Sequence, residues 1–172
     1  KLRCLENHDQ ERIAHHLGED KQSILNWTAF SFLLKGTAFV YAGQECMISH
    51  RPSIFDKDAT DFAGGEDISG FIARCAKIKK QELSADVIYG SFGDDDRNVA
   101  YLWCKMGREC VVSIFSLKGY RGEIAAHLAY GGYENLLTEE LVSVSDGKLT
   151  HDGTPIVIKL DTDSLLEKEM RM

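Results

Sequence analysis

Hydrophobic and polar positions change their pattern near the middle of the chain. Before about Leu83, short apolar runs alternate with segments in which apolar residues recur every three or four positions. After about Ser84, short runs rich in β-branched and aromatic residues are separated by Gly and Asp turns. The change predicts two domains, residues 1–83 with helices and strands and residues 84–172 with antiparallel strands.

The first half predicts strands and helices in alternation. Strands are expected at residues 2–5 and 37–42, the second a nearly continuous apolar run of the kind that is buried on both faces. Helices are expected at residues 21–35, with Asp20 as N-cap, and at residues 68–82. Gly36 should end the earlier helix in a left-handed conformation. This order is typical of parallel β/α architecture.

The second half predicts an antiparallel β domain. Asp-Gly pairs between apolar runs, such as Asp146-Gly147, are a strong hairpin signal. The chain after Asp161 is expected to fray. Six strands are expected, at residues 87–92, 99–104, 110–116, 123–129, 141–144 and 155–160.

Charge and hydropathy exclude some functions. The chain has 172 residues, with 20 Lys and Arg against 27 Asp and Glu, and a net charge of −7. This balance argues against nucleic-acid binding, which needs a basic face. No apolar run approaches the roughly 20 residues of a membrane-spanning helix. The chain opens without Met or a signal peptide, and we interpret it as a fragment or a processed product.

The five cysteines are expected to be mostly buried thiols, because their number is odd and no spacing matches a CxxC framework. A Cys104–Cys110 disulfide is the less favoured alternative. Unpaired cysteines weakly favour a reducing compartment such as the cytoplasm, while the localisation stays open between that and a periplasmic or extracellular one.

Two polar clusters follow the two predicted parallel strands. Asn7, His8 and Asp9, with Arg12 nearby, come after the first strand, and Gln44-Glu45 come after the second. Active sites of β/α proteins lie at the carboxyl ends of their strands, so these clusters are candidate site residues. The alternative is a strand-end turn in which Asp9 caps the next segment.

Other clusters carry weaker signals. The pair His15-His16 is more typical of a solvated surface than of a zinc site. The run Asp94-Asp95-Asp96 lacks the spacing of a calcium loop, and we interpret it as a turn. No metal site and no cofactor is therefore predicted from these residues.

The two strand-end clusters resemble signature segments of the α-amylase family of glycoside hydrolases. Residues 5–12, Leu-Glu-Asn-His-Asp-Gln-Glu-Arg, look like the family's segment at the end of the seventh barrel strand. Residues 36–45, which end in Tyr-Ala-Gly-Gln-Glu, resemble the segment of the eighth strand. Residues 51–58 and 71–81 resemble the following loop and helix, and the second half resembles the family's C-terminal β domain.

The resemblance implies a fold and a set of roles. The fold is the C-terminal remnant of a TIM (β/α)8 barrel followed by an antiparallel β-sandwich. Asp9 matches the family's third carboxylate, which binds sugar hydroxyls, and His8 matches its transition-state-stabilising His. Asn7, Gln44 and Glu45 are expected at substrate-binding positions. The implied reaction is retaining hydrolysis of α-glucosidic bonds in starch-like or related α-glucans.

The resemblance also implies partners. A full barrel needs about 250 residues, so the nucleophilic Asp and the acid/base Glu are expected upstream, in an N-terminal barrel portion that is the main partner. The fragment alone should be inactive, and its unpaired strand edge predicts a homodimer. Calcium could bind the intact enzyme. The alternative function is a non-catalytic carbohydrate-binding or interaction module built on the β domain.

Overall fold

The computed structural model describes residues 1–83 and 87–166. The chain forms two compact units, Lys1–Lys77 and Ile78–Met172. The predicted domain boundary, between residues 83 and 84, borders a segment outside the described residues and stays a prediction. Among the described residues, no helix has the length and apolar character needed to cross a membrane.

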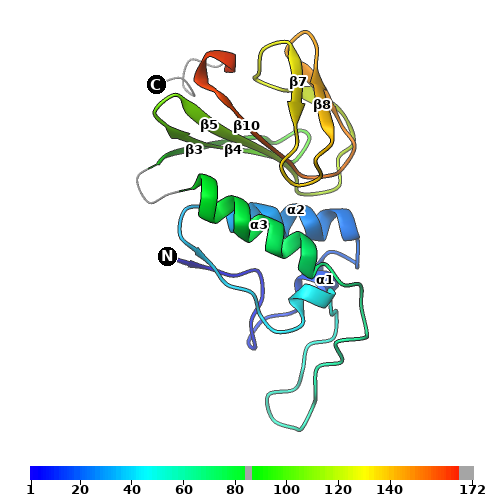
Figure 1. Cartoon of the computed structure of the whole chain (residues 1–172). Helices are drawn as coiled ribbons and strands as arrows, with labels where there is room; N and C mark the ends of the chain where they lie inside the picture. The colour runs from blue at the N-terminus through cyan, green and yellow to red at the C-terminus, as the bar shows by residue number, and fades with distance from the viewer. Residues whose placement is uncertain (84–86, 167–172) are drawn as a thin grey trace. The chain divides into compact units, whose positions relative to one another are not determined.

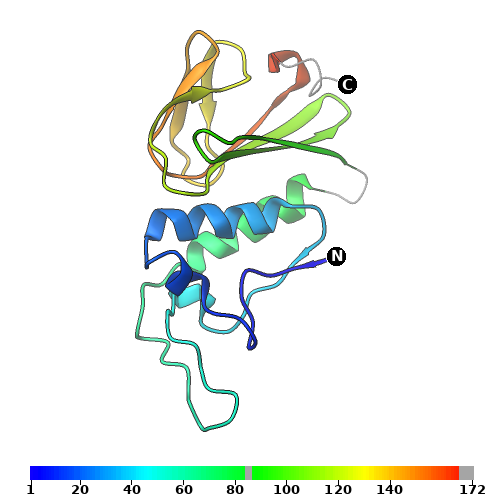
Figure 2. The ribbon, with the colours of Figure 1, turned by 180° about the vertical axis from the view of Figure 1, so that it is seen from behind.

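The first unit contains a pair of short parallel strands, β1 (Leu2–Arg3) and β2 (Thr37–Ala38), joined through helices. Figure 2 shows the two segments side by side. Parallel pairing was predicted from the strand–helix–strand order. The strands are shorter than predicted, and the expectation that residues 37–42 are buried on both faces is wrong, since Phe39 is 38% exposed. The reason is that β1 is the sole neighbour of β2 among the described residues.

Helix α2 (Lys21–Leu33) begins as predicted, because the Asp20 carboxylate accepts a hydrogen bond from Ser23 N at 2.8 Å. The role predicted for Gly36 is wrong. The helix ends at Leu33, and Leu34 is already extended. Gly36, at φ +123°, instead lies against the N-terminal strand, where a Cβ would be 2.4 Å from the Lys1 carbonyl oxygen. A close approach of two backbones therefore requires this glycine.

Helix α3 (Ser69–Glu82) follows a long irregular connection and begins one residue later than predicted (Figure 1). Ile68, Cys75 and Ile78, which recur at helical spacing in this segment, are buried. A short helix, α1 (Ile13–His16), was not predicted, because four residues are too few to show a period. Ala14, Ile24 and Ile68 form one buried apolar cluster of the first unit.

The second unit is antiparallel, as predicted. Its four-stranded sheet has the order β10-β5-β4-β3, and two further ribbons pair β6 with β9 and β7 with β8 (Figure 1). One continuous apolar core joins residues from the sheet and from both ribbons. The strands are β3 (Ile88–Asp94), β4 (Val99–Met106), β5 (Glu109–Ser116), β6 (Gly122–Ala125), β7 (Gly131–Glu134), β8 (Leu141–Val144), β9 (Lys148–His151) and β10 (Ile156–Asp161).

Three details of this unit differ from prediction. Strands β7 and β9 were missed, since Gly-Gly-Tyr-Glu has the composition of a turn and Lys-Leu-Thr-His contains one apolar residue. Strand β6 ends at Ala125 rather than at Ala129. Fraying after Asp161 is wrong for its first residues, because Thr162–Ser164 form the 3-10 turn η2 and Leu165 is fully buried in the core. Residues 167–172 lie outside the described residues.

The five cysteines are free thiols. Cys75, Cys104 and Cys110 are buried as expected, whereas Cys4 is exposed and Cys46 is partly exposed. Burial raises the pKa of Cys75 and Cys104 to about 12 and that of Cys110 to about 11. These three side chains therefore stay protonated at neutral pH and act as apolar core residues.

Candidate active site

The Asn-His-Asp cluster lies in a tight turn just after β1. The Asp9 N–H donates a hydrogen bond of 2.8 Å to Asn7 Oδ1, and Gln10 N donates to the Asn7 carbonyl at 3.2 Å. This turn leaves the side chains of His8 and Asp9 65% and 69% exposed, with His8 Nε2 3.3 Å from Asp9 Oδ2. A carboxylate and an imidazole are thus presented together to solvent at the end of a strand. The two groups can accept and donate hydrogen bonds to a polar ligand.

Gln44 and Glu45 lie in the 3-10 turn η1 (Gln44–Cys46), after β2. Gln44 is 2% exposed, and its Oε1 accepts a hydrogen bond from Tyr41 N at 3.4 Å. Glu45 Oε2 accepts from Gly43 N at 2.9 Å. Both side chains therefore support the backbone of their own turn. Their substrate-binding role stays a prediction.

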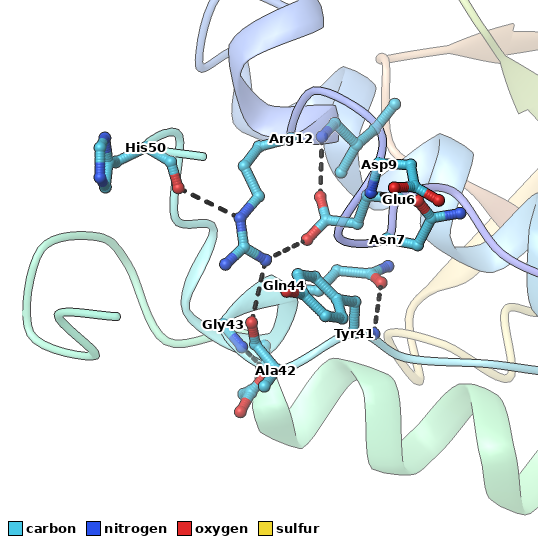
Figure 3. Close-up of polar contacts among 11 residues, drawn as sticks. Glu6, Asn7, Asp9, Arg12, Tyr41, Ala42, Gly43, Gln44 and His50 are labelled. Carbon is cyan, nitrogen blue, oxygen red and sulfur yellow. Dashed lines mark hydrogen bonds and ion pairs between the residues drawn. The ribbon is translucent and has the colours of Figure 1, made fainter. Parts of the chain in front are cut away.

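A buried ion pair connects these two segments. Arg12 is 0% exposed and Glu6 is 1% exposed, and Arg12 Nη1 donates to Glu6 Oε1 at 2.7 Å. The same Nη1 donates to the Ala42 carbonyl at 2.9 Å, and Arg12 Nε donates to the His50 carbonyl at 3.2 Å. The Tyr41 ring lies 4.7 Å from the guanidinium carbon. Figure 3 shows these contacts from one side chain to both strand ends.

Arg12 can be identified from the sequence as a neighbour of the Asn-His-Asp cluster, whereas the role of Glu6 cannot. A Glu beside Asn-His-Asp has the polarity of a solvated turn, and only its burial distinguishes it. The second carboxylate oxygen, Glu6 Oε2, accepts from Ile13 N at 2.7 Å and so also fixes the start of α1. The available signal was the apolar context of Arg12, which is followed directly by Ile13 and Ala14.

The loop between η1 and α3 has its own polar supports. Asp58 Oδ2 lies 2.8 Å from His50 Nε2 and accepts from Ser53 N at 2.9 Å. The hydrogen bond from Ser53 N is the larger cause that lowers the pKa of Asp58, and the contact with His50 lowers this pKa further. At the surface, Arg51 Nη1 lies 3.3 Å from Glu11 Oε1. The loop is therefore tied both to itself and to the segment after β1.

Among the described residues, no group of three or more His, Cys, Asp or Glu side chains is placed to hold a metal ion. His15 and His16 are exposed at the end of α1. Asp94 forms an ion pair of 2.8 Å with Arg97. The side-chain hydrogen bond from Arg97 is the main cause that lowers the pKa of Asp94. A calcium site in an intact enzyme stays a prediction.

The arrangement of strand ends, helices and antiparallel strands defines a class of protein. Two parallel strand ends carry polar side chains, helices follow each strand, and an antiparallel β unit comes next. The described residues form no closed barrel, and they match the C-terminal part of a β/α barrel with its β domain.

Comparison with protein families identifies the class more narrowly. Residues 2–106, more than half of the chain, match the alpha-amylase catalytic domain, and residues 81–158 match the bacterial alpha-amylase C-terminal domain. The chain therefore belongs to the alpha-amylase family. A comparison with curated proteins found no significant match.

Solved structures agree with this assignment. An alpha-amylase from Lactobacillus plantarum is 34% identical, with a TM-score of 0.81 over 93% of this chain and 38% of its own. A maltogenic alpha-amylase from Thermotoga neapolitana is 21% identical, with a TM-score of 0.76 over 94% of this chain and 41% of its own, which shows the fold alone. The chain thus spans about two fifths of the length of these relatives.

Proposed function

We propose that this chain is the C-terminal portion of a retaining glycoside hydrolase that acts on α-glucosidic bonds of starch-like or related α-glucans. The observation that carries the proposal is the exposed His8–Asp9 pair at a strand end, in a chain of the alpha-amylase family. The 34% identity to an alpha-amylase supports the substrate class.

The proposed roles follow from the chemistry of the exposed groups. Retaining hydrolysis passes through an oxocarbenium-like transition state, in which positive charge develops on the sugar ring. The Asp9 carboxylate would accept hydrogen bonds from sugar hydroxyls and stabilise that charge, while His8 would donate a hydrogen bond to the same ring. Asn7 would hold the turn, since its Oδ1 already binds Asp9 N.

The remaining chemistry would come from a partner. A retaining site needs two carboxyl groups about 5–5.5 Å apart, one as nucleophile and one as acid/base. We assign both to the N-terminal barrel portion. Nucleic acid is not a proposed partner, given the net charge of −7.

Turnover tests the proposal. The full-length protein that carries this chain is incubated with soluble starch and with an aryl α-glucoside, and its folding is checked by circular dichroism. New reducing ends from starch are expected. A folded protein that leaves both substrates intact for hours would contradict the proposed function.

Glycan binding by the second unit is the second candidate function. A groove of about 290 Å³ is lined by hydroxyl and carboxylate side chains together with the apolar side chains of Leu141, Val142 and Ile156. An adjoining hollow of about 240 Å³ shares Ser143 and Thr150 with it. Such side chains suit sugar hydroxyls. Titration of residues 78–172 with maltoheptaose, followed by amide NMR, separates the candidates. Amide chemical-shift changes confined to this groove, together with a full-length protein that cannot cut starch, would favour the binding module.

A further inference from the structure

Arg12 contacts three segments that are far apart in the sequence. Glu6 belongs to the segment that leads into Asn7, His8 and Asp9, and its carboxylate accepts a hydrogen bond from Arg12 Nη1. The Ala42 carbonyl directly precedes the Gly43-Gln44-Glu45 turn and accepts a hydrogen bond from the same nitrogen. The His50 carbonyl, at the base of the following loop, accepts a hydrogen bond from Arg12 Nε. One guanidinium group therefore holds the two predicted parts of the site and the loop beside them.

Burial makes this contact specific. Both charges are almost completely removed from solvent, so the loss of one partner leaves an uncompensated charge in a medium of low dielectric constant. Both oxygens of Glu6 are used, one by Arg12 and one by Ile13 N. The pair thus has no alternative partner in solvent, and it tolerates only a narrow range of positions for the three segments.

The geometry also requires arginine rather than a cation in general. The guanidinium group is flat and donates from Nε and Nη1 in fixed, divergent directions. Lysine would keep the charge but has a single nitrogen, which cannot occupy both positions. Gly43 leaves room for this flat group, since a Cβ there would be 3.2 Å from Arg12 Nη2.

We infer that Arg12 is a positioning residue of the proposed active site, which sets the segment of His8 and Asp9 against the turn of Gln44 and Glu45. This inference rests on the proposed function. Arg12 does not touch the sugar, because it is fully buried and the exposed groups beside it are His8 and Asp9. It acts through the backbone that carries them.

The test compares Arg12→Lys with a matched control, Arg51→Lys. Arg51 also bridges the segments after β1 and β2, by its ion pair with Glu11, but it is 36% exposed. An exposed pair of this kind contributes little. Because Arg12→Lys keeps the charge opposite Glu6, the variant should fold, and a thermal melt verifies this for both proteins.

Hydrogen exchange of the 172-residue chain is the first readout. In Arg12→Lys, amides of residues 6–13 and 41–46 should exchange about tenfold faster, while α2 stays unchanged. Arg51→Lys should match the wild type. Faster exchange in one segment only, or in neither, would overturn the inference.

Kinetics of the full-length protein on starch is the second readout. Measured well below the melting temperature, Arg12→Lys should lower kcat about 10²-fold with a smaller change in KM, because a misplacement of about 1 Å has that effect on rate. An unchanged kcat per folded molecule would reduce Arg12 to a purely structural residue and overturn the inference. An inactive wild type contradicts the proposed function instead, and the exchange readout still decides whether Arg12 links the segments.

Discussion

At the scale of single residues, Asp9 is held by its backbone and not by its side chain. Its N–H donates a hydrogen bond to Asn7 Oδ1, whereas among the described residues its carboxylate lies against the exposed His8 ring. Asp9→Asn should therefore leave the melting temperature nearly unchanged. In the full-length protein it should lower kcat about 10²–10³-fold, since a preorganised charge acts mainly on the transition state.

The matched control for this variant is Asp95→Asn, at an exposed turn of the second unit. It removes one surface carboxylate and should change neither kcat nor the melting temperature. If Asp9 were only a structural turn residue, Asp9→Asn would lower the melting temperature and leave kcat per folded molecule intact. Measuring both quantities on both variants decides between these roles.

His151 predicts a pH dependence of stability. Its side chain is fully buried, and its Nδ1 accepts a hydrogen bond from Gly153 N at 3.0 Å. Burial lowers the pKa of His151 below the usual 6.5, although the nearby Asp152 opposes the shift. The unfolded chain therefore binds a proton that the folded chain does not, and stability present above pH 6.5 is lost as the pH falls below it.

Urea denaturation of residues 78–172 at pH 7.5 and 5.5 measures this effect. The free energy of unfolding should fall by about 1 kcal/mol for the wild type, since one pH unit of proton linkage is worth about 1.4 kcal/mol. His151→Asn keeps an acceptor for Gly153 N but does not titrate, so it should lose clearly less. Equal losses in the two proteins would rule out His151 as the cause.

The residue types of the candidate site could be predicted from the sequence, but their environments could not. Asn7, His8 and Asp9 stand out because three polar residues follow a strand. Glu6 does not, because sequence alone cannot tell a buried carboxylate from a solvated one. Glu6 can be buried because its carboxylate pairs with Arg12, and the fold of the intervening residues brings the two side chains together.

At the scale of elements, Gly36 is the position where α2 and the strands depend on each other. Gly36→Ala would place a Cβ 2.4 Å from the Lys1 carbonyl oxygen, at a φ of +123° that alanine does not readily adopt. The first unit should lose about 1–3 kcal/mol of stability. Gly70→Ala is the control, because a Cβ in the first turn of α3 meets no atom within 4 Å, and it should be neutral or slightly stabilising.

Fluorine NMR of 5-fluorotryptophan measures this change in one unit at a time. The chain has two tryptophans, Trp27 in the first unit and Trp103 in the second. In Gly36→Ala the Trp27 signal should convert to its unfolded position at lower urea, with the Trp103 signal unchanged. A Trp27 transition at the wild-type urea concentration would contradict the proposed backbone contact.

Elements were predictable where their pattern is long. The helices α2 and α3 have 13 and 14 residues, enough for a cap or a stripe to show. The burial predicted for residues 37–42 is wrong because an apolar run indicates burial, whereas the actual burial of a strand depends on neighbours on both of its edges. Strand β7 and helix α1 have four residues each, too few for their composition to outweigh turn signals.

At the scale of the whole molecule, the second unit has a core of its own. Its sheet and both ribbons contribute to one buried cluster, which extends to Leu165. Residues 78–172 expressed alone should give a dispersed amide NMR spectrum and a cooperative melt. A version that ends at Asp161 should melt at lower temperature, because it loses the fully buried Leu165 side chain. Poor dispersion of the longer version would contradict an independent unit.

The change in texture along the sequence correctly indicated a β/α part followed by an antiparallel part. Where one ends and the other begins is harder to predict, because α3 continues from the first unit into the second. The two family matches also overlap, over residues 81–106.

We propose that this chain completes a retaining hydrolase of α-glucans. Proton NMR of maltoheptaose during digestion by the full-length protein tests it most directly, because the anomeric signals report both bond cleavage and stereochemistry. New reducing ends should appear first as the α-anomer, since a covalent intermediate preserves the configuration. First appearance of the β-anomer, or a folded protein that produces no new anomeric signal, would contradict it.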